Sequence, residues 1–210
     1  MEEKDKTLTF VPYDKKSEEQ KEEIAKFNTD LLNRVDGYDR FIQFGLLYNY
    51  SIKDLLDLHE PISSINEKVM RYFVYDKGTC VGIIILDWCK LFDQNTNALN
   101  VYYLLIKPSE MHKGYGTKIM KELMTNGANI IGKKFSEINL SVDIRNEACQ
   151  RMSEKLGFIR EGKSGYYYLY SWKQNTNGKN FNVPKKDIEA NGKEVQETGE
   201  KDSIFAASCG

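Results

Sequence analysis

The chain has 210 residues, of which 40% are hydrophobic and 12% aromatic, and its formal net charge is -1. This length and composition suffice for a sizeable hydrophobic core, so we expect one folded globular domain rather than a disordered chain. The balanced charge, without a basic stripe, argues against a nucleic-acid partner, and no apolar run is long enough to cross a bilayer.

The N-terminal residues and the cysteine spacing indicate in which cellular compartment the protein is expected. The first residues, MEEKDKTLTF, lack the apolar segment of a secretory signal. The four cysteines show neither metal-ligand nor CxxC spacing, and the two histidines are too few for a His-rich metal site. We therefore expect a cytoplasmic protein with reduced thiols, no bound metal and no membrane partner.

The first half of the chain predicts one strand and two helices. Residues 7–14, TLTFVPYD, read as a short strand, and SEEQ at 17–20 has the form of a capping box. The helix that it opens places apolar side chains on one face, namely Ile24, Phe27, Leu31 and Val35. An aromatic stretch follows, and a second short helix from Ser51 is predicted to stop at Pro61.

The second half reads mostly as strands. RYFVY and TCVGIIILDW flank a DKG turn as a hairpin, and ALNVYYLLIKP is apolar on both faces and hence central. SEINLSVDI is a half-buried strand, NEACQRMSEKLGF a helix ended by Gly157, and residues 158–172 a hairpin that turns near 162–165. The order β, α, α, β, β, β, α, β, α, β, β predicts an α+β fold. Residues 174–210 are polar and glycine-bearing, and we expect a flexible tail.

The segment KPSEMHKGYGTKIMKELM, residues 107–124, joins the central strand to an amphipathic helix through a turn with Gly114 and Gly116. A helix N-terminus carries unpaired N–H groups and a positive dipole end, so it can bind an anion such as phosphate. The spacing fits neither the GxxxxGK[ST] loop nor the dinucleotide fingerprint, whose third glycine is Ile119 here. A tight strand-to-helix turn without a ligand remains the alternative.

Four motifs together resemble the GCN5-related N-acetyltransferase (GNAT) superfamily. They are Ile106-x-Pro108, Gly114-x-Gly116, Asn146-x-Ala148 and Leu156-Gly157-Phe158. The resemblance covers roughly Thr7 to Lys173, and the domain is expected to span residues 1–173. It implies an acyl-CoA N-acyltransferase-like domain with a mixed, mostly antiparallel twisted sheet flanked by helices in three layers. It also implies acetyl-CoA as co-substrate.

The resemblance assigns coenzyme-binding roles. The family loop Q/R-x-x-G-x-G/A reads here with Met111 in place of the Gln or Arg, which removes one polar contact and keeps the amide cradle. The pyrophosphate would lie against Met111, His112, Lys113, Gly114, Tyr115, Gly116 and Thr117. The pantetheine arm would pair with the strand edge at Leu104, Leu105 and Ile106. Asn146 would contact the coenzyme and also cap the following helix.

The catalytic candidates are weaker. Ser153 stands where the family often has a tyrosine that protonates the leaving thiolate. Ser141 stands where relatives that modify protein N-termini carry a glutamate, which argues against that specialisation. Asp143 lies near the presumed thioester, with a structural role as the alternative. Tyr103 and its neighbour Tyr102 are expected on the central strand, where one would face the coenzyme cleft and the other the core.

These residues imply an N-acetyltransferase that transfers an acetyl group from acetyl-CoA to a primary amine by direct attack in a ternary complex. The acceptor is expected to be a small molecule rather than a protein, and the chain a monomer or homodimer. Two alternatives remain open: a catalytically weak CoA-binding sensor or regulatory module, and an interaction protein that acts through its tail.

Overall fold

The computed structural model describes residues 8–44, 51–57, 69–89 and 97–174. Its elements are β1 (Thr9–Pro12), α1 (Glu18–Arg34), α2 (Gly37–Phe44), α3 (Ile52–Asp57), β2 (Met70–Asp76), β3 (Thr79–Cys89), β4 (Ala98–Ile106), η1 (Pro108–Glu110), α4 (Tyr115–Ile131), β5 (Glu137–Asp143), α5 (Glu147–Lys155), β6 (Ile159–Ser164) and β7 (Tyr167–Lys173). No helix in these ranges is long and apolar enough to cross a membrane.

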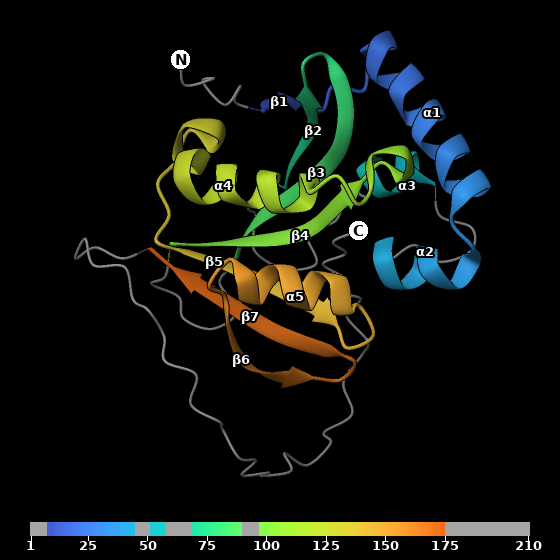
Figure 1. Cartoon of the computed structure of the whole chain (residues 1–210). Coiled ribbons are helices and arrows are strands. Elements are labelled where there is room, and N and C mark those ends of the chain that lie inside the picture. The colour runs from blue at the N-terminus through green and yellow to red at the C-terminus, as the bar shows by residue number, and fades with distance from the viewer. Residues whose placement is uncertain (1–7, 45–50, 58–68, 90–96, 175–210) are drawn as a thin grey trace, which may run out of the picture.

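The strands form one seven-stranded sheet in the order β1-β2-β3-β4-β5-β7-β6 (Figure 1). All neighbouring pairs are antiparallel except β4 and β5, which run parallel. The central place of β4 and the mostly antiparallel α+β sheet are confirmed. The α4 segment follows β4 and leads to β5 because a parallel pair needs a crossover connection.

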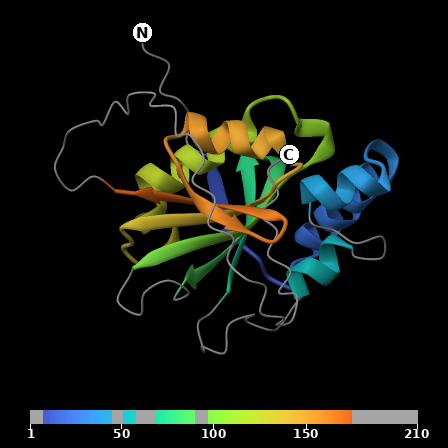
Figure 2. The same ribbon diagram turned by 90° about the horizontal axis from the view of Figure 1, so that it is seen from below.

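Helices cover both faces of the sheet. On one face α4 and α5 lie side by side (Figures 1 and 2), and α4 contributes Ile119, Met120 and Leu123 to the core beneath them. On the other face α1 and α3 bury Phe27 and Ile52 against β2, β3 and β4. The three-layer arrangement expected from the sequence is therefore present.

Helix α1 begins as its sequence predicts. The Ser17 side chain accepts a hydrogen bond from the Gln20 backbone N–H at 3.3 Å. The predicted apolar face is buried in full, with Ile24, Phe27, Leu31 and Val35 all in the core. The capping box is only half formed, because the Gln20 side chain bonds elsewhere: its Nε2 donates to the Pro12 carbonyl of β1 at 3.0 Å, and its Oε1 accepts from the Asp14 backbone N–H at 2.8 Å.

One helix was not expected from the sequence. The aromatic stretch contains an additional helix, α2, whose first turn is capped by Asp36, which accepts from the Asp39 N–H at 2.8 Å. The last hairpin turns at Gly165, where φ is 54°, at the end of the predicted range, and Gly162 lies at a register shift in β6. The predicted helix stop at Pro61 and the tail from residue 175 lie outside the described residues.

Candidate active site

Strands β4 and β5 pair over only part of their length. The parallel register runs from Ala98↔Glu137 to Val101↔Leu140 and stops there. Beyond this point β4 continues to Ile106 on β3, while β5 continues to Asp143 on β7. The two strands therefore diverge inside the sheet, and residues 102–106 of β4 turn an open edge toward the gap. The predicted coenzyme edge, Leu104–Ile106, lies on this stretch.

The turn that follows β4 brings backbone N–H groups together at the start of α4. Gly114 is the N-cap with φ of 82°, and it has no side chain to cap the helix. The first helical hydrogen bond is Lys118 N–H to the Gly114 carbonyl, at 3.0 Å. The N–H groups from Gly114 to Thr117 have no acceptor among the described residues. This is the arrangement that binds an anion at a helix N-terminus.

A pocket of about 250 Å³ opens at this helix start. The loop and η1 form one wall and the first turns of α5 form the other. The lining residues are Ile106, Glu110, Met111, His112, Gly114, Tyr115, Gly116, Thr117, Ala148 and Met152. Most of the predicted loop residues thus meet at one cavity, and Glu110, Ala148 and Met152 line it without having been predicted from the sequence.

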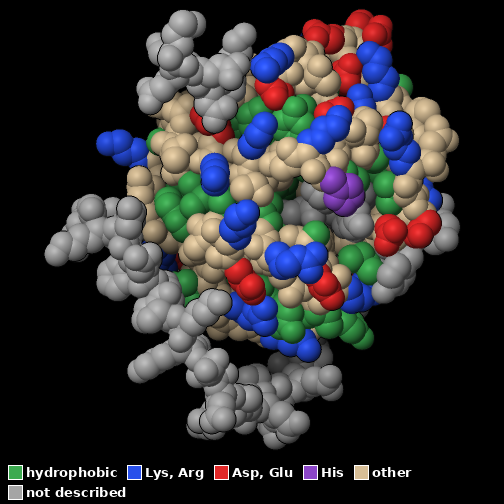
Figure 3. All heavy atoms as spheres, in the orientation of Figure 1, with side chains coloured by type: hydrophobic (Ala, Val, Ile, Leu, Met, Phe, Trp, Pro, Cys, Tyr) green, Lys and Arg blue, Asp and Glu red, His purple; other side chains and the backbone are tan. Residues whose placement is uncertain are grey.

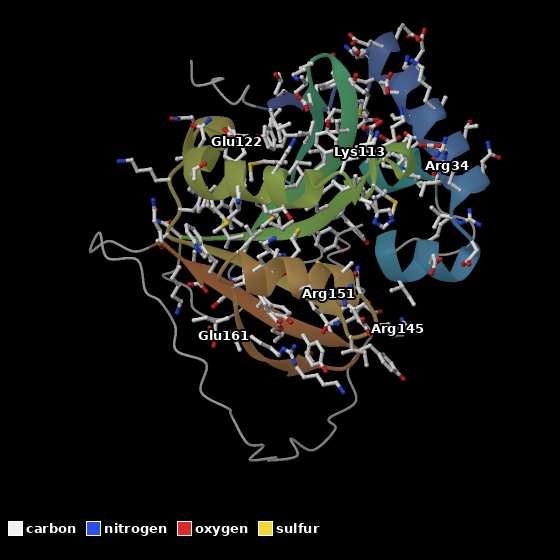
Figure 4. The ribbon with its side chains drawn as sticks, in the orientation of Figure 1. Arg34, Lys113, Glu122, Arg145, Arg151 and Glu161 are labelled. Carbon is white, nitrogen blue, oxygen red and sulfur yellow. The ribbon has the colours of Figure 1, made fainter. Side chains whose placement is uncertain are left out.

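Four of the predicted coenzyme residues do not line this pocket: Leu104, Leu105, Lys113 and Asn146. Leu104 and Leu105 are fully buried, in the cores on opposite faces of the sheet, so only their backbone can meet a ligand in the gap. The Lys113 ammonium forms an ion pair with Glu110 at 2.9 Å and is half exposed. Figure 4 shows Lys113 close to the start of α4.

The charges around the pocket are mixed. Lys118 stacks over the Tyr115 ring, with its ammonium 5.0 Å from the ring centroid. Glu110 places a carboxylate on the pocket wall, beside Lys113. Lys and Arg side chains are scattered over the face of the molecule that carries α4 and α5 (Figure 3). The site therefore offers backbone N–H groups and nearby lysines to an anion, with one carboxylate opposing it.

Asn146 is a helix cap with a second anchor. Its Oδ1 accepts from the Cys149 backbone N–H at 3.1 Å, and its Nδ2 donates to the Ile42 carbonyl of α2 at 3.4 Å. Both ends of the amide thus contact the chain itself, and the side chain is 3% exposed. The predicted cap is present, and the contact with the coenzyme stays a prediction.

Ser153 does not face solvent, contrary to the alternative that would place it on an exposed helix face. The side chain is 0% exposed, and its hydroxyl donates to the Cys149 carbonyl at 2.9 Å. Its hydrogen is therefore committed to the helix backbone, and Met152, one residue earlier, is the residue that lines the pocket. The geometry gives Ser153 no role as a proton donor.

Asp143 is held in a salt bridge. Arg145 grips both carboxylate oxygens, with Nε at 2.9 Å and Nη2 at 2.7 Å. Burial alone would raise the pKa of Asp143, but the hydrogen bonds and charge of Arg145 hold that pKa below its ordinary value. A carboxylate so stabilised is a poor general base. Its geometry favours the structural role.

A β-bulge changes where the two tyrosines of β4 point. The register with β3 passes from Leu86↔Val101 to Ile85↔Tyr103, so Tyr102 is the extra residue. Both rings consequently pack on the α1 side of the sheet, in edge-to-face contact with centroids 4.7 Å apart. Tyr103 is 4% exposed and belongs to the core.

Comparisons with known proteins agree with this geometry. A family model described as an acetyltransferase (GNAT) domain matches residues 3–159. The N-alpha-acetyltransferase MAK3 of Arabidopsis thaliana is 30% identical over 131 residues, which are 54% of this chain and 60% of that protein. The match thus spans less than two thirds of that relative's length.

Two solved structures share the fold. The PaiA N-acetyltransferase of Thermoplasma acidophilum, in complex with coenzyme A, superposes with a TM-score of 0.51 at 20% identity, covering 80% of this chain and 99% of that one. The spermidine N-acetyltransferase of Vibrio cholerae, in complex with CoA and spermine, gives 0.52 at 16% identity, covering 79% and 93%. Because the family model matches well over half of the sequence, this chain belongs to the acetyltransferase (GNAT) domain family.

Proposed function

We propose that the protein transfers an acetyl group from acetyl-CoA to a primary amine. One observation carries the proposal: the gap between β4 and β5 leads directly into a loop whose N–H groups converge at the start of α4. An extended chain that ends in a diphosphate matches such a site, because its amides can pair with a strand edge and its phosphates with a helix N-terminus. The pantetheine diphosphate of coenzyme A has this form.

The chain's own residues fit acetyl-CoA in three places. The open edge of β4 would hold the pantetheine arm, the N–H groups from Gly114 to Thr117 the diphosphate, and Ala148 and Met152 the opposite side of the coenzyme. Gly114 adopts a left-handed φ and faces open space where a Cβ would project, so the loop can approach a phosphate closely. Met111, in place of the family Gln or Arg, adds apolar contact only.

The transfer itself is proposed as direct attack in a ternary complex. The amine nitrogen forms the new bond to the thioester carbonyl carbon, the carbon–sulfur bond breaks, and the amine proton passes to solvent or to the leaving thiolate. Since neither Ser153 nor Asp143 is arranged as an acid or base, binding and orientation would supply most of the rate enhancement. We propose a cytoplasmic protein whose acceptor is a small molecule.

A CoA-binding sensor is the second candidate. The commitment of the Ser153 hydroxyl to the helix and the salt bridge of Asp143 favour it, since both remove catalytic candidates. The decisive experiment measures free CoA released from acetyl-CoA with a panel of polyamines, aminoglycosides, aryl amines and N-terminal peptides. Thiol release with an amine supports the transferase, and binding without release supports the sensor. Release only with peptides would overturn the small-molecule acceptor.

A further inference from the structure

Residues 107–109 lead into the loop from Met111 to Thr117, which we call the coenzyme loop. Helix α1 contacts residues 107–109 at two points. The Ser109 backbone N–H donates to Asp30 Oδ2 at 2.7 Å, across 79 positions of sequence. Two residues earlier, the Lys107 ammonium lies 3.5 Å from Glu23 Oε2, and both side chains are 16% exposed. Figure 4 shows Arg34 on α1, on the same side of the molecule as Lys113. Helix α1 therefore anchors the stretch that enters the loop.

Asp30 supplies a hydrogen-bond acceptor that the residues around η1 do not provide. The short helix η1 starts at Pro108, which has no N–H, and its N-cap residue Lys107 makes no side-chain cap bond. The next N–H, that of Ser109, is partly buried and has no acceptor within η1, so it needs one from elsewhere. The carboxylate of Asp30 provides one from a distant helix, so it acts as a tertiary cap.

The carboxylate of Asp30 is itself well supported. Its Oδ1 pairs with Arg34 Nε at 2.6 Å, and its side chain is only 14% exposed. Burial raises the pKa of Asp30, but the hydrogen bonds from Ser109 and the charges of Arg34 and Lys107 outweigh it and leave the pKa below its ordinary value. Asp30 therefore stays ionised, and a charged acceptor holds an N–H more strongly than a neutral one.

The coenzyme loop needs such support because its backbone is strained. His112 has φ of 63°, which is costly for a residue with a Cβ, whereas the left-handed φ of Gly114 carries no such cost because glycine has no Cβ. A costly conformation such as that of His112 persists only where the surrounding contacts impose it. Between Ser109 and His112 lie two residues, so a fixed Ser109 restricts the path of the chain into the loop.

We propose that Asp30 is a positioning residue for acetyl-CoA: by holding the Ser109 N–H it keeps the loop from Met111 to Thr117 in its coenzyme-binding conformation. This inference rests on the proposed function, because it assumes that the loop binds the coenzyme. It assigns to α1, whose side chains do not line this pocket, an effect on coenzyme affinity that is transmitted through the loop. The effect should appear in binding and hardly in the rate at saturating coenzyme.

The test is calorimetric titration of CoA into the full chain and three variants. Asp30→Leu removes the acceptor and should raise Kd roughly tenfold. Asp30→Asn keeps an amide oxygen in place and should raise Kd about threefold. Glu22→Gln is the matched control, since Glu22 is exposed on the same helix and pairs only weakly with Lys26 at 3.9 Å; its Kd should equal that of the wild type.

A second readout separates positioning from general destabilisation. Hydrogen exchange of peptides covering residues 109–117 should accelerate in Asp30→Leu, with exchange in β5 and β7 unchanged. With an acceptor amine identified, the KM for acetyl-CoA should rise while kcat changes less than threefold. A folded Asp30→Leu protein that binds CoA within twofold of wild type overturns the inference.

Other outcomes are also decisive. If wild-type protein binds no CoA, the proposed function fails, and with it the premise of the inference. If Asp30→Leu does not fold, Lys107→Met and Asp30→Asn replace it, and unchanged CoA affinity in both overturns the inference. A kcat loss with unchanged KM and Kd would mean that Asp30 acts elsewhere in the reaction.

Discussion

The Tyr115 phenol donates a hydrogen bond to Asp76 at 2.9 Å, which ties the first residue of α4 to the end of β2. The N-terminus of α4 is thereby fixed against the β2–β3 hairpin. Tyr115 also lines the pocket, so one side chain serves the fold and the site.

We predict that Tyr115→Phe lowers the free energy of unfolding by about 1 kcal/mol, because one partly buried hydrogen bond to a carboxylate is lost. Urea denaturation measures this difference. Tyr166→Phe is the control: Tyr166 is 71% exposed, so its stability should not change. Equal stability of Tyr115→Phe and wild type would show that the bond contributes nothing in solution.

Gly116→Val should abolish measurable CoA binding while the protein stays folded. Gly116 is buried in the first turn of α4 and lines the pocket, so a branched side chain would enter the space that the diphosphate needs. Calorimetry measures the loss of CoA binding, and circular dichroism shows whether the protein stays folded. Gly162→Val is the control, because Gly162 also has no positive φ, has open space around its Cβ position and lies in β6, outside the pocket lining.

Glu110→Gln should tighten CoA binding roughly threefold, since it removes a carboxylate from the wall of an anion site. Lys113→Gln should weaken it by a similar factor. Both effects should shrink in high salt, which screens exposed charges. Titrations at low and high ionic strength check this, and a salt-independent effect of Glu110→Gln would mean that the residue acts by shape.

Ser153→Ala should change the transfer rate far less than a hundredfold and the free energy of unfolding by less than about 1 kcal/mol, because its hydroxyl only bonds the preceding turn of α5. Steady-state kinetics with any accepted amine measures the rate. Ser153→Tyr should instead destabilise the protein by about 1–3 kcal/mol or more, since this site is fully buried. Loss of transfer in a folded Ser153→Ala protein would place the hydroxyl in the reaction.

Asp57→Asn should reduce stability at neutral pH and flatten its acid dependence. The hydrogen bond from Lys53 is the largest influence and lowers the pKa of Asp57, and hydrogen bonds from Tyr13 and Lys15 lower it further. Burial raises this pKa but is outweighed, so the pKa falls to about 2. The unfolded value is about 4, so the stabilisation is present above pH 4 and is lost as the pH falls toward 2. Allowing for solvent screening, we expect a difference on the order of 1 kcal/mol. Urea unfolding of both proteins at several pH values tests whether their stabilities converge in acid.

Local patterns predicted much of this fold. The buried face of α1 follows from the spacing of Ile24, Phe27 and Leu31, because helical periodicity sets which side chains meet the sheet. The loop at Gly114 was predictable for a similar reason, since glycines at a strand-to-helix junction allow a left-handed turn. Both features depend on residues close in sequence.

The features that sequence reasoning missed depend on tertiary contacts. The residues around Tyr102 do not predict a bulge, because the register change arises from the pairing of β3 with β4. The burial of Ser153 depends on how α5 lies on the sheet, and Asp30 meets Ser109 only after α1 has packed. These contacts join residues that are far apart in the sequence. Local sequence patterns cannot predict them, and they become visible only in the structure.

The partial pairing of β4 also predicts how its backbone exchanges hydrogen with solvent. From Ala98 to Val101 the strand has neighbours on both edges, whereas from Leu104 to Ile106 only β3 lies beside it among the described strands. Amides in the first stretch should exchange slowly throughout. In the second, amides alternate in direction, so those that point into the gap should exchange quickly while those bonded to β3 stay protected. If the pantetheine arm pairs with this edge, only the amides that point into the gap should exchange more slowly when the coenzyme is bound. The protected amides would then be every second residue of this stretch, and they would mark where the arm lies.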